Sequence, residues 1–299
     1  MTGTIQQIDR DAYHADCTPE ASLSASVGKI VVTKSPFHGW LAHPKLNPDY
    51  KPDESTTFDL GTAAHDLILE GGTPRICVID PQDYRSKPKK IGDEGSIPTG
   101  WTNNAIREAR DQARQNGLTP ILPWDNAVIR NMKDVAMEFV AQSEIAGIFE
   151  DGKPEQTLLW QDSGIWCRAR VDWLTTDRRV ILDYKTSASA QPDWFSRQIA
   201  SMGYDFQAAF YLRGLKACGH PNAQFVFLAQ EIDPPHACSL HGIAPSMMQI
   251  AEGRVQQAID TWRKCLTTGK WPAYDNRVHW AEATAWQMQD YEQSLQEAA

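Results

Sequence analysis

The chain has 299 residues, with 29 Lys and Arg residues against 38 Asp and Glu residues, so its formal net charge is −9. A hydrophobic fraction of 41% is enough for a large core and excludes a disordered or fibrous chain. The acidic balance argues against a protein that coats nucleic acid through bulk positive charge, although it leaves room for a local basic groove.

The N-terminus and the cysteines indicate the compartment. Residues 1–17 lack a basic start followed by an apolar run, and no apolar stretch approaches the roughly 18 residues that span a bilayer. The 6 cysteines lie far apart and none forms a CxxC pair, a pattern that argues against a zinc or iron–sulfur site. We therefore expect a cytoplasmic protein with reduced thiols and no membrane contact.

The hydrophobic pattern predicts helices first, then a block of strands, then helices and strands again. The first 25 or so residues are polar and are expected to be irregular. In chain order we predict a helix over 57–70, a strand over 76–79, helices over 103–116 and 124–149, strands over 155–160, 165–174 and 180–185, helices over 194–202 and 204–217, a strand over 224–231 and a helix over 245–268.

This order predicts an α/β fold with a central mixed β-sheet flanked by helices. We expect three segments along the chain: an N-terminal polar segment over 1–25, one domain over 26–275, and an acidic helical tail over 276–299.

The chemistry is concentrated on two neighbouring strands of the predicted sheet. Side chains alternate along a strand, so Asp183 and Lys185 project side by side on one face. If the strands over 165–174 and 180–185 pair through the short turn between them, Asp172 reaches the same face. Two adjacent carboxylates repel each other unless a cation lies between them, and oxygen ligands suit Mg²⁺ or Mn²⁺. Lys185 would then orient a water molecule or stabilise charge on a phosphate.

Other residues in the same order strengthen this reading, because an Asp-x-Lys triplet alone is more often a structural ion pair. His65 lies one helical turn after Gly61, which would let its helix approach another element closely. Glu155 opens the first strand of the block. Gln207 and Tyr211 share one face of the helix that follows the Asp-x-Lys strand.

This set resembles the RecB-like branch of the PD-(D/E)XK nuclease superfamily, in which a GxxxH helix, a Glu strand, an Asp strand, a D-x-K strand and a QxxxY helix follow in this order. The sequence of 154–174, 180–190 and 203–215 is similar to the nuclease domain of the phage and prophage exonuclease VIII (RecE) family. The resemblance covers roughly residues 24–274 and implies a restriction-endonuclease-like core.

The resemblance implies a role for each matching residue. Asp172, Asp183 and His65 would bind the metal, together with the backbone carbonyl of Tyr184. Glu155 would be a carboxylate at or just behind the metal, and Lys185 would position or activate the attacking water. Gln207 and Tyr211 would place the DNA strand. The iron–sulfur relatives carry a cysteine cluster that this chain lacks, so no such cluster is implied.

The family also implies a substrate and partners. The substrate would be the ends of linear double-stranded DNA, cut 5′→3′ with Mg²⁺ or Mn²⁺ to leave 3′ single strands for recombination. The protein would form a homo-oligomer, a tetramer by analogy, and would act with a single-strand annealing protein. The family also implies a phage or prophage origin in a bacterial host. Neither polarity nor assembly follows from the residues themselves.

Local groups of basic residues are the predicted DNA contacts despite the net charge. The expected contacts are Lys87, Lys89, Lys90, Arg107, Arg110, Arg114, Arg168 and Arg170. They would follow a phosphate backbone, whereas an ordinary solvated surface is the alternative for the first six.

Two alternatives remain open at this point. One is another nuclease with the same chemistry, such as a structure-specific endonuclease or a RecB-like CRISPR-associated nuclease. The other is a non-catalytic DNA-binding protein on a nuclease fold, which an intact set of His65, Asp172, Asp183 and Lys185 disfavours.

Overall fold

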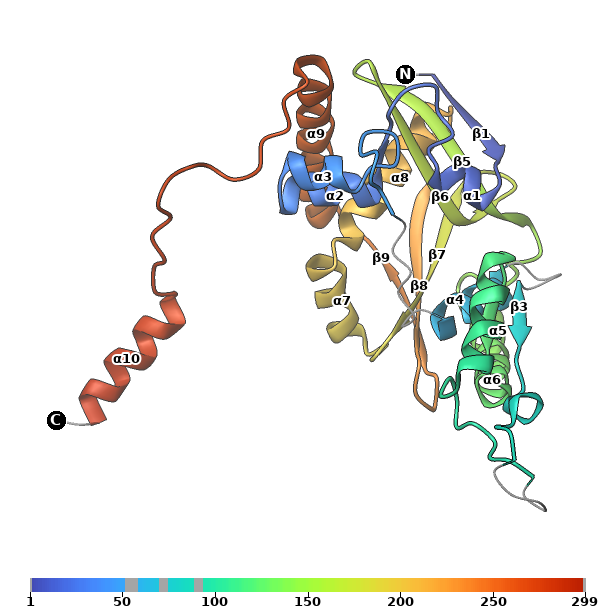
Figure 1. The fold of residues 1–299 in the computed structure, drawn as a ribbon. Helices are drawn as coiled ribbons and strands as arrows, with labels where there is room; N and C mark the ends of the chain where they lie inside the picture. Colours follow the sequence, from blue (N-terminus) through green and yellow to red (C-terminus); the bar gives the residue numbers. More distant parts are fainter. Residues whose placement is uncertain (1, 52–58, 70–74, 89–93, 298–299) are drawn as a thin grey trace.

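The computed structural model describes residues 2–51, 59–69, 75–88 and 94–297 (Figure 1). Within these ranges, seven strands form the main sheet in the order β1-β5-β6-β7-β8-β9, with β2 paired to β6. Their bounds are β1 (Gly3–Gln7), β2 (Leu23–Ser24), β5 (Gly152–Asp162), β6 (Ile165–Thr175), β7 (Val180–Ser187), β8 (Gln224–Glu231) and β9 (Cys238–Gly242). The β7–β8 and β2–β6 pairs are parallel and the others antiparallel, so the sheet is mixed as predicted.

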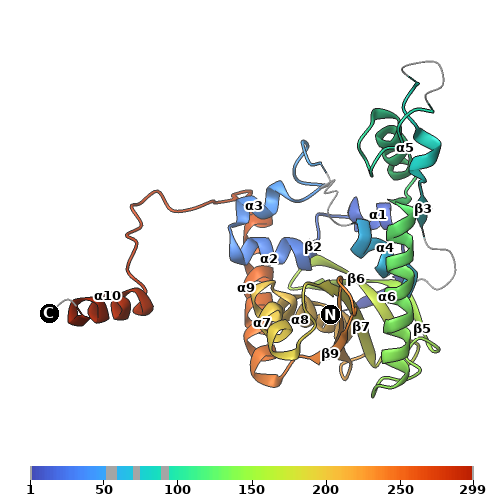
Figure 2. The same ribbon diagram turned by 90° about the horizontal axis from the view of Figure 1, so that it is seen from below.

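Helices cover both faces of this sheet (Figures 1 and 2). The helices of one face are α2 (Ala25–Thr33), α7 (Pro192–Ser201), α8 (Tyr204–Ala217) and α9 (Pro245–Thr268), and those of the other are α4 (Asp59–Leu69) and α6 (Pro123–Ala141). Each face encloses a separate hydrophobic core. The predicted α/β class with a central mixed sheet is therefore confirmed.

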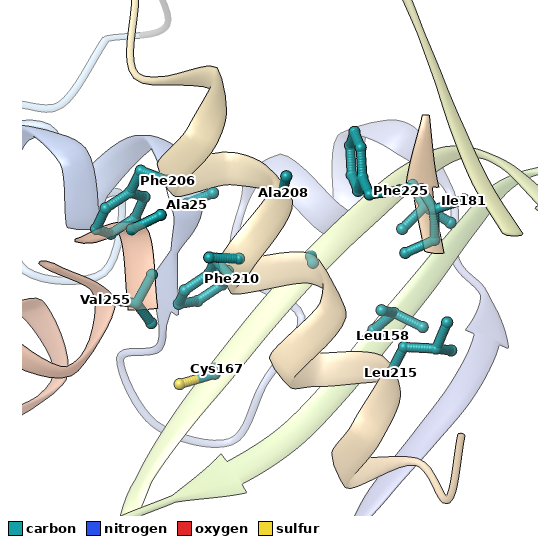
Figure 3. Close-up of a cluster of buried hydrophobic side chains, with 14 of the residues drawn as sticks. Ala25, Leu158, Cys167, Ile181, Phe206, Ala208, Phe210, Leu215, Phe225 and Val255 are labelled. Carbon is teal, nitrogen blue, oxygen red and sulfur yellow. The ribbon is translucent and has the colours of Figure 1, made fainter. Parts of the chain in front are cut away.

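Helix α8 is the centre of the larger core (Figure 3). Its Phe206, Phe210 and Leu215 are fully buried, and Phe206 lies beside Ala25 of α2 and Val255 of α9. These contacts fix α8 across the sheet. They leave the opposite side of its first turns, which carries Gln207 and Tyr211, toward β6 and β7.

A second, two-stranded sheet joins one of the main cores. Its strands β3 (Ile76–Val78) and β4 (Thr119–Ile121) pair in parallel, and their Ile76 and Ile121 pack into the core under α4 and α6. A minor core connects Cys77 of β3 with the 3₁₀ helix η2 (Pro81–Tyr84) and with α5 (Asn104–Gln115). Helix α3 (Pro36–Leu41) packs against α2 and α9, whereas α10 (Ala285–Glu297) has no buried residue and lies away from the body (Figure 1).

The expectation that residues 1–25 are irregular is wrong. Strand β1 pairs antiparallel with β5 over five residues, and α1 (Arg10–His14) follows with Asp9 as its N-cap. Strand β1 is an edge strand whose residues are half-buried or exposed, so its pairing rests on backbone hydrogen bonds rather than on an apolar pattern.

One other expectation needs correction. The helix predicted over 124–149 ends at Ala141, because Ser143 and a left-handed Gly147 (φ +79°) turn the chain before Ile148 and Phe149 pack into the core. Strand β6 contributes to both cores near Asp172, since Val171 belongs to the core under α8 and Trp173 to the core under α4 and α6. Among the described residues, no helix has the length and apolarity needed to cross a membrane.

Candidate active site

The candidate site lies where β6 and β7 separate. The two strands pair only at Trp173–Leu182 and Leu174–Ile181, and β6 then turns to pair with β2. The next opposing positions beyond these pairs are Asp172 and Asp183, which face the same side at the fork. The predicted convergence of the two carboxylates is therefore a consequence of this register.

Both carboxylates are held in place by hydrogen bonds. Asp183 is fully buried, accepts a hydrogen bond from Gln207 Nε2 at 2.6 Å, and forms an ion pair with Lys185 Nζ. Asp172 accepts the backbone N–H of Tyr184 at 3.0 Å. The Tyr184 side chain points to the opposite core, where its hydroxyl donates to Gln230 at 2.6 Å, so only its backbone belongs to the site.

His65 of α4 completes one side of the cluster. Its Nε2 lies 3.2 Å from Asp172 Oδ2 and 3.8 Å from Glu155 Oε1. A Cβ on Gly61 would lie 2.9 Å from Thr186 Oγ1 of β7. The predicted close approach of this helix is therefore present, and it is the reason His65 reaches the carboxylates.

Glu155 reaches the site through an unusual backbone conformation. Its φ is +56° inside strand β5, although the residues on either side keep their pairing with β6. This turn directs the carboxylate to Arg170, with which it forms an ion pair, and toward His65. A left-handed non-glycine residue costs about 1–2 kcal/mol, and such strain gathers at functional sites.

This strain gives a testable prediction for stability. We expect Glu155→Gly to be more stable than Glu155→Ala by about 1 kcal/mol, because glycine adopts positive φ without a Cβ penalty. Both variants lose the ion pair to Arg170, so their difference isolates the backbone. Chemical denaturation measures it, and the exposed Gln161 of the same strand is the control, where alanine should exceed glycine in stability. Equal stabilities at position 155 would contradict the strain.

The electrostatics of the cluster follow from burial and charge. Burial and the nearby Asp172 carboxylate raise the pKa of Asp183 to about 6. Burial disfavours the charged form of His65, but Asp172 and Asp66 outweigh it and raise the pKa of His65 to about 10. Burial also opposes the charge on Lys185, yet Asp183 and Asp172 raise its pKa, so it stays cationic. Two cations thus offset the crowded carboxylates.

These side chains fit a hard divalent cation by their chemistry. Three carboxylates and one imidazole lie near the fork, and burial and Asp172 raise the pKa of Asp183, so a further positive charge beside these carboxylates would relieve their repulsion. Within the described part of the chain, no three His, Cys, Asp or Glu side chains already converge on one point. Their oxygens pair with Lys185, Gln207 and His65 instead, so His65 must lose its proton before it can be a ligand.

Two cavities flank the carboxylates and include residues that the sequence did not indicate. One, of about 400 Å³, is lined by Arg10, His14, Gly61, Thr62, His65, Asp66, Glu155, Arg170, Tyr184, Lys185, Thr186 and Tyr204. The other, of about 250 Å³, is lined by Tyr13, His14, Ser24, Ala25, Ser26, Lys29, Glu155, Arg170, Asp172, Gln207 and Tyr211. The contributions of α1 and α2 could not be anticipated, because residues 10–33 have no pattern typical of a site.

The predicted DNA contacts have different positions. Gln207, Tyr211 and Arg170 line the cavities at the site. Arg168 is buried, because its guanidinium pairs with Asp16 at 3.2 Å, so its side chain is not exposed to a DNA strand. This burial corrects the prediction for Arg168.

The remaining predicted contacts are basic residues outside the cavities. Lys87 is exposed in the loop after η2, while Lys89 and Lys90 lie outside the described residues. Arg107, Arg110 and Arg114 do lie on α5, but none lines either cavity at the site. Arg110 and Arg114 approach Asp111 to 2.8 and 3.9 Å, so their local charge is partly offset.

The comparison with protein families decides the relationship. The profile of a family described as "PDDEXK-like domain of unknown function (DUF3799)" matches residues 106–284, more than half of the chain. The chain belongs to this family. The matched range of this PDDEXK-like protein contains Glu155, Asp172, Asp183, Lys185 and Gln207, whereas His65 precedes it.

One solved structure agrees with the fold. A crystal structure titled "Putative exonuclease" from Eubacterium rectale superimposes with a TM-score of 0.58 at 14% identity, covering 96% of this chain and 98% of that chain. A phage related exonuclease from Haemophilus somnus 129PT matches with a TM-score of 0.32 and 11% identity over 83% of this chain and 96% of that chain. A search of curated proteins finds no match to the PDDEXK-like protein.

Proposed function

We propose that this PDDEXK-like protein is a divalent-metal-dependent nuclease that hydrolyses phosphodiester bonds of DNA. The observation that supports this most is the meeting of Asp172, Asp183 and Lys185 at the β6–β7 fork. His65 and Glu155 complete the cluster from α4 and β5. A divalent cation bound there would lower the pKa of water and neutralise charge on a phosphate.

The protein's own residues supply orientation and charge. Gln207 donates to Asp183 and the Tyr184 amide donates to Asp172, so both carboxylates are fixed before a substrate arrives. Lys185 is cationic as arranged here, and it therefore donates hydrogen bonds to a phosphate oxygen or a water rather than removing a proton. Its Nζ lies 5.4 Å from the centre of the Tyr204 ring, which limits its movement.

The finer proposal concerns substrate and context. We propose Mg²⁺ or Mn²⁺ as the cation and the ends of linear double-stranded DNA as substrate, degraded 5′→3′ to 3′ single strands for recombination with an annealing protein. A homo-oligomer, cytoplasmic action and a phage or prophage origin belong to the same proposal. Its support is the similarity to the exonuclease VIII family, which is strongest over residues 155–214.

One experiment tests activity and direction together. Linear duplex DNA labelled at its 5′ or its 3′ end is incubated with the protein and Mg²⁺, next to a covalently closed circle of the same sequence. The proposal expects early release of the 5′ label, an intact circle, and no cleavage in EDTA. Cutting of the circle would favour an endonuclease. No cleavage of any substrate with Mg²⁺ or Mn²⁺ would refute the proposed activity.

Gly61 provides a further prediction about the geometry of the site. Gly61→Ala is expected to lower cleavage by about tenfold or more, because the new Cβ would push α4, and with it His65, away from Thr186. The free energy of unfolding should hardly change, since alanine favours the helix. The double variant Gly61→Ala, Thr186→Ala removes the hydroxyl at 2.9 Å and should regain most of the activity. A double variant as impaired as the single one would contradict this explanation.

A further inference from the structure

Helix α1 is fixed above the carboxylate site by contacts on both of its sides. Before it, β1 pairs with β5, and Asp9 accepts the backbone N–H groups of Asp11 and Ala12 at 2.9 and 3.3 Å. Within it, Tyr13 is buried with the Arg168 guanidinium 5.5 Å from its ring centre. The side chains of this short helix therefore have a defined place beside the site.

Arg10 and His14 of α1 line the larger cavity together with His65 and Lys185. The smaller cavity contains Asp172, and it shares His14, Glu155 and Arg170 with the larger one. The shared lining residues show that the two cavities adjoin each other beside the carboxylates and α1. The two cavities thus describe one path rather than two sites.

The donors along this path are largely unused. In the described ranges of the chain, the Arg10 side chain makes no hydrogen bond or ion pair. Arg170 pairs with Glu155 through Nε, but its Nη1 is buried without a hydrogen-bond partner. Lys29 of α2, in the smaller cavity, makes one long bond of 3.4 Å to the Met202 carbonyl. A buried donor without a partner, such as Arg170 Nη1, is costly, so this arrangement favours a ligand that accepts hydrogen bonds.

The charge of the group specifies the ligand. Arg10, Arg170 and Lys29 are cationic, and burial together with Arg10 and Arg170 lowers the pKa of His14, which shows how positive its surroundings are. An anion with several acceptor oxygens relieves this repulsion and satisfies the donors. A phosphate has this chemistry, and guanidinium groups bind it in a bidentate manner.

We propose that Arg10 and His14 of α1, with Arg170 of β6, hold a phosphate of the substrate strand next to the phosphate that is cleaved. The inference rests on the proposed function, and it assigns the N-terminal segment to substrate binding. Side chains carry it, not the end of the helix, since α1 has only five residues.

The test measures binding separately from cleavage. Fluorescence anisotropy of a short labelled DNA, with Ca²⁺ in place of Mg²⁺, gives Kd for the wild type, Arg10→Ala, His14→Ala and the double variant. We expect Kd to rise about tenfold in the double variant. The slope of log Kd against log salt concentration should fall by the amount that corresponds to about one lost phosphate contact. In cleavage assays KM should rise similarly, while kcat changes little. Arg10→Lys should bind DNA more tightly than Arg10→Ala but less tightly than the wild type, because lysine keeps the positive charge but lacks the bidentate guanidinium group.

Arg263→Ala is the matched control, since Arg263 is an exposed arginine of α9 that pairs only locally with Asp260. If the double variant unfolds, Arg10→Gln alone serves, because the Arg10 side chain makes no hydrogen bond or ion pair with the residues that the structure describes. DNA with a 5′-phosphate and DNA with a 5′-hydroxyl distinguish a terminal from an internal phosphate. If the variants raise Kd only for DNA with a 5′-phosphate, the bound group is the terminal phosphate. If they raise Kd equally for both DNAs, the bound group is an internal phosphate.

Two negative outcomes have different meanings. A wild type that binds and cleaves DNA, beside a double variant with unchanged Kd and salt slope, overturns the role of α1 alone. A wild type that neither binds nor cleaves DNA overturns the proposed function and this inference together.

Discussion

Replacing Asp183 with Asn is expected to reduce cleavage by at least about a hundredfold, the usual cost of losing one preorganised electrostatic group in an active site. Asp183 is fully buried, and its two oxygens contact Lys185 and Gln207. The amide keeps the size of the side chain but loses the charge that a divalent cation needs. The loss should appear in kcat, because the proposed DNA contacts of α1 and α8 remain.

The measurement needs a control for folding and for the substitution itself. Asp193→Asn places the same change on an exposed residue at the start of α7, and it should retain full activity. Circular dichroism and thermal unfolding should show a folded Asp183→Asn protein, since the change removes a buried carboxylate that the neighbouring Asp172 carboxylate repels. An Asp183→Asn protein that cleaves DNA at a rate close to the wild type in Mg²⁺ would reject the site.

The sequence was informative where a regular element imposes the geometry. Alternation along β6 and β7 and the short turn between them place Asp172 opposite Asp183, and one helical turn places His65 near Gly61. These are local relations, and they were predicted correctly. Helix α8 begins and ends at the predicted residues, which put Gln207 next to Asp183.

The sequence was less informative where contacts join distant parts of the chain. Strand β1 has one inward apolar residue, Ile5, and its pairing with β5 depends on backbone groups that carry no sequence signal. The positive φ of Glu155 is also invisible in the sequence, because Glu is not a residue that favours this region. Arg168 lies four residues before Asp172 in the same strand, which predicts the same face, and it was therefore assigned to DNA binding. Its actual partner is Asp16 of the N-terminal segment.

That partner connects the fold to the proposed site. Asp16, Thr18, Ser22, His43 and Arg168 form a buried polar cluster, which we call the Asp16 cluster. It anchors the segment after α1 to β6 and to the loop after α3. Through α1, the same anchor fixes Arg10 and His14 above the carboxylates. The placement of the proposed phosphate contacts thus depends on a cluster that takes no part in the chemistry.

Asp16→Asn is therefore expected to destabilise the protein by about 3–5 kcal/mol, the usual cost of leaving one charge of a buried pair without its partner. Asp16 accepts Ser22 N–H at 2.9 Å and the Ser22 hydroxyl at 2.8 Å, and it lies 3.2 Å from both His43 and Arg168. The asparagine keeps the shape and tolerates the left-handed backbone at this position (φ +68°). The loss therefore reports on charge, and chemical denaturation near pH 7 measures it.

The dependence on pH separates this charge effect from a packing defect. Burial opposes ionisation of Asp16, but His43 and Arg168 outweigh it and hold the pKa of Asp16 well below its usual range. Because the folded pKa lies below the unfolded value of about 3.9, the stabilisation is complete above roughly pH 5 and is lost as the pH falls toward the folded value. The difference in unfolding free energy between wild type and Asp16→Asn should shrink over that range. Asp11→Asn, on the exposed side of α1, should show neither the loss nor the pH dependence. A difference that stays constant down to pH 2 would assign the effect to packing and contradict the ionic role of the Asp16 cluster.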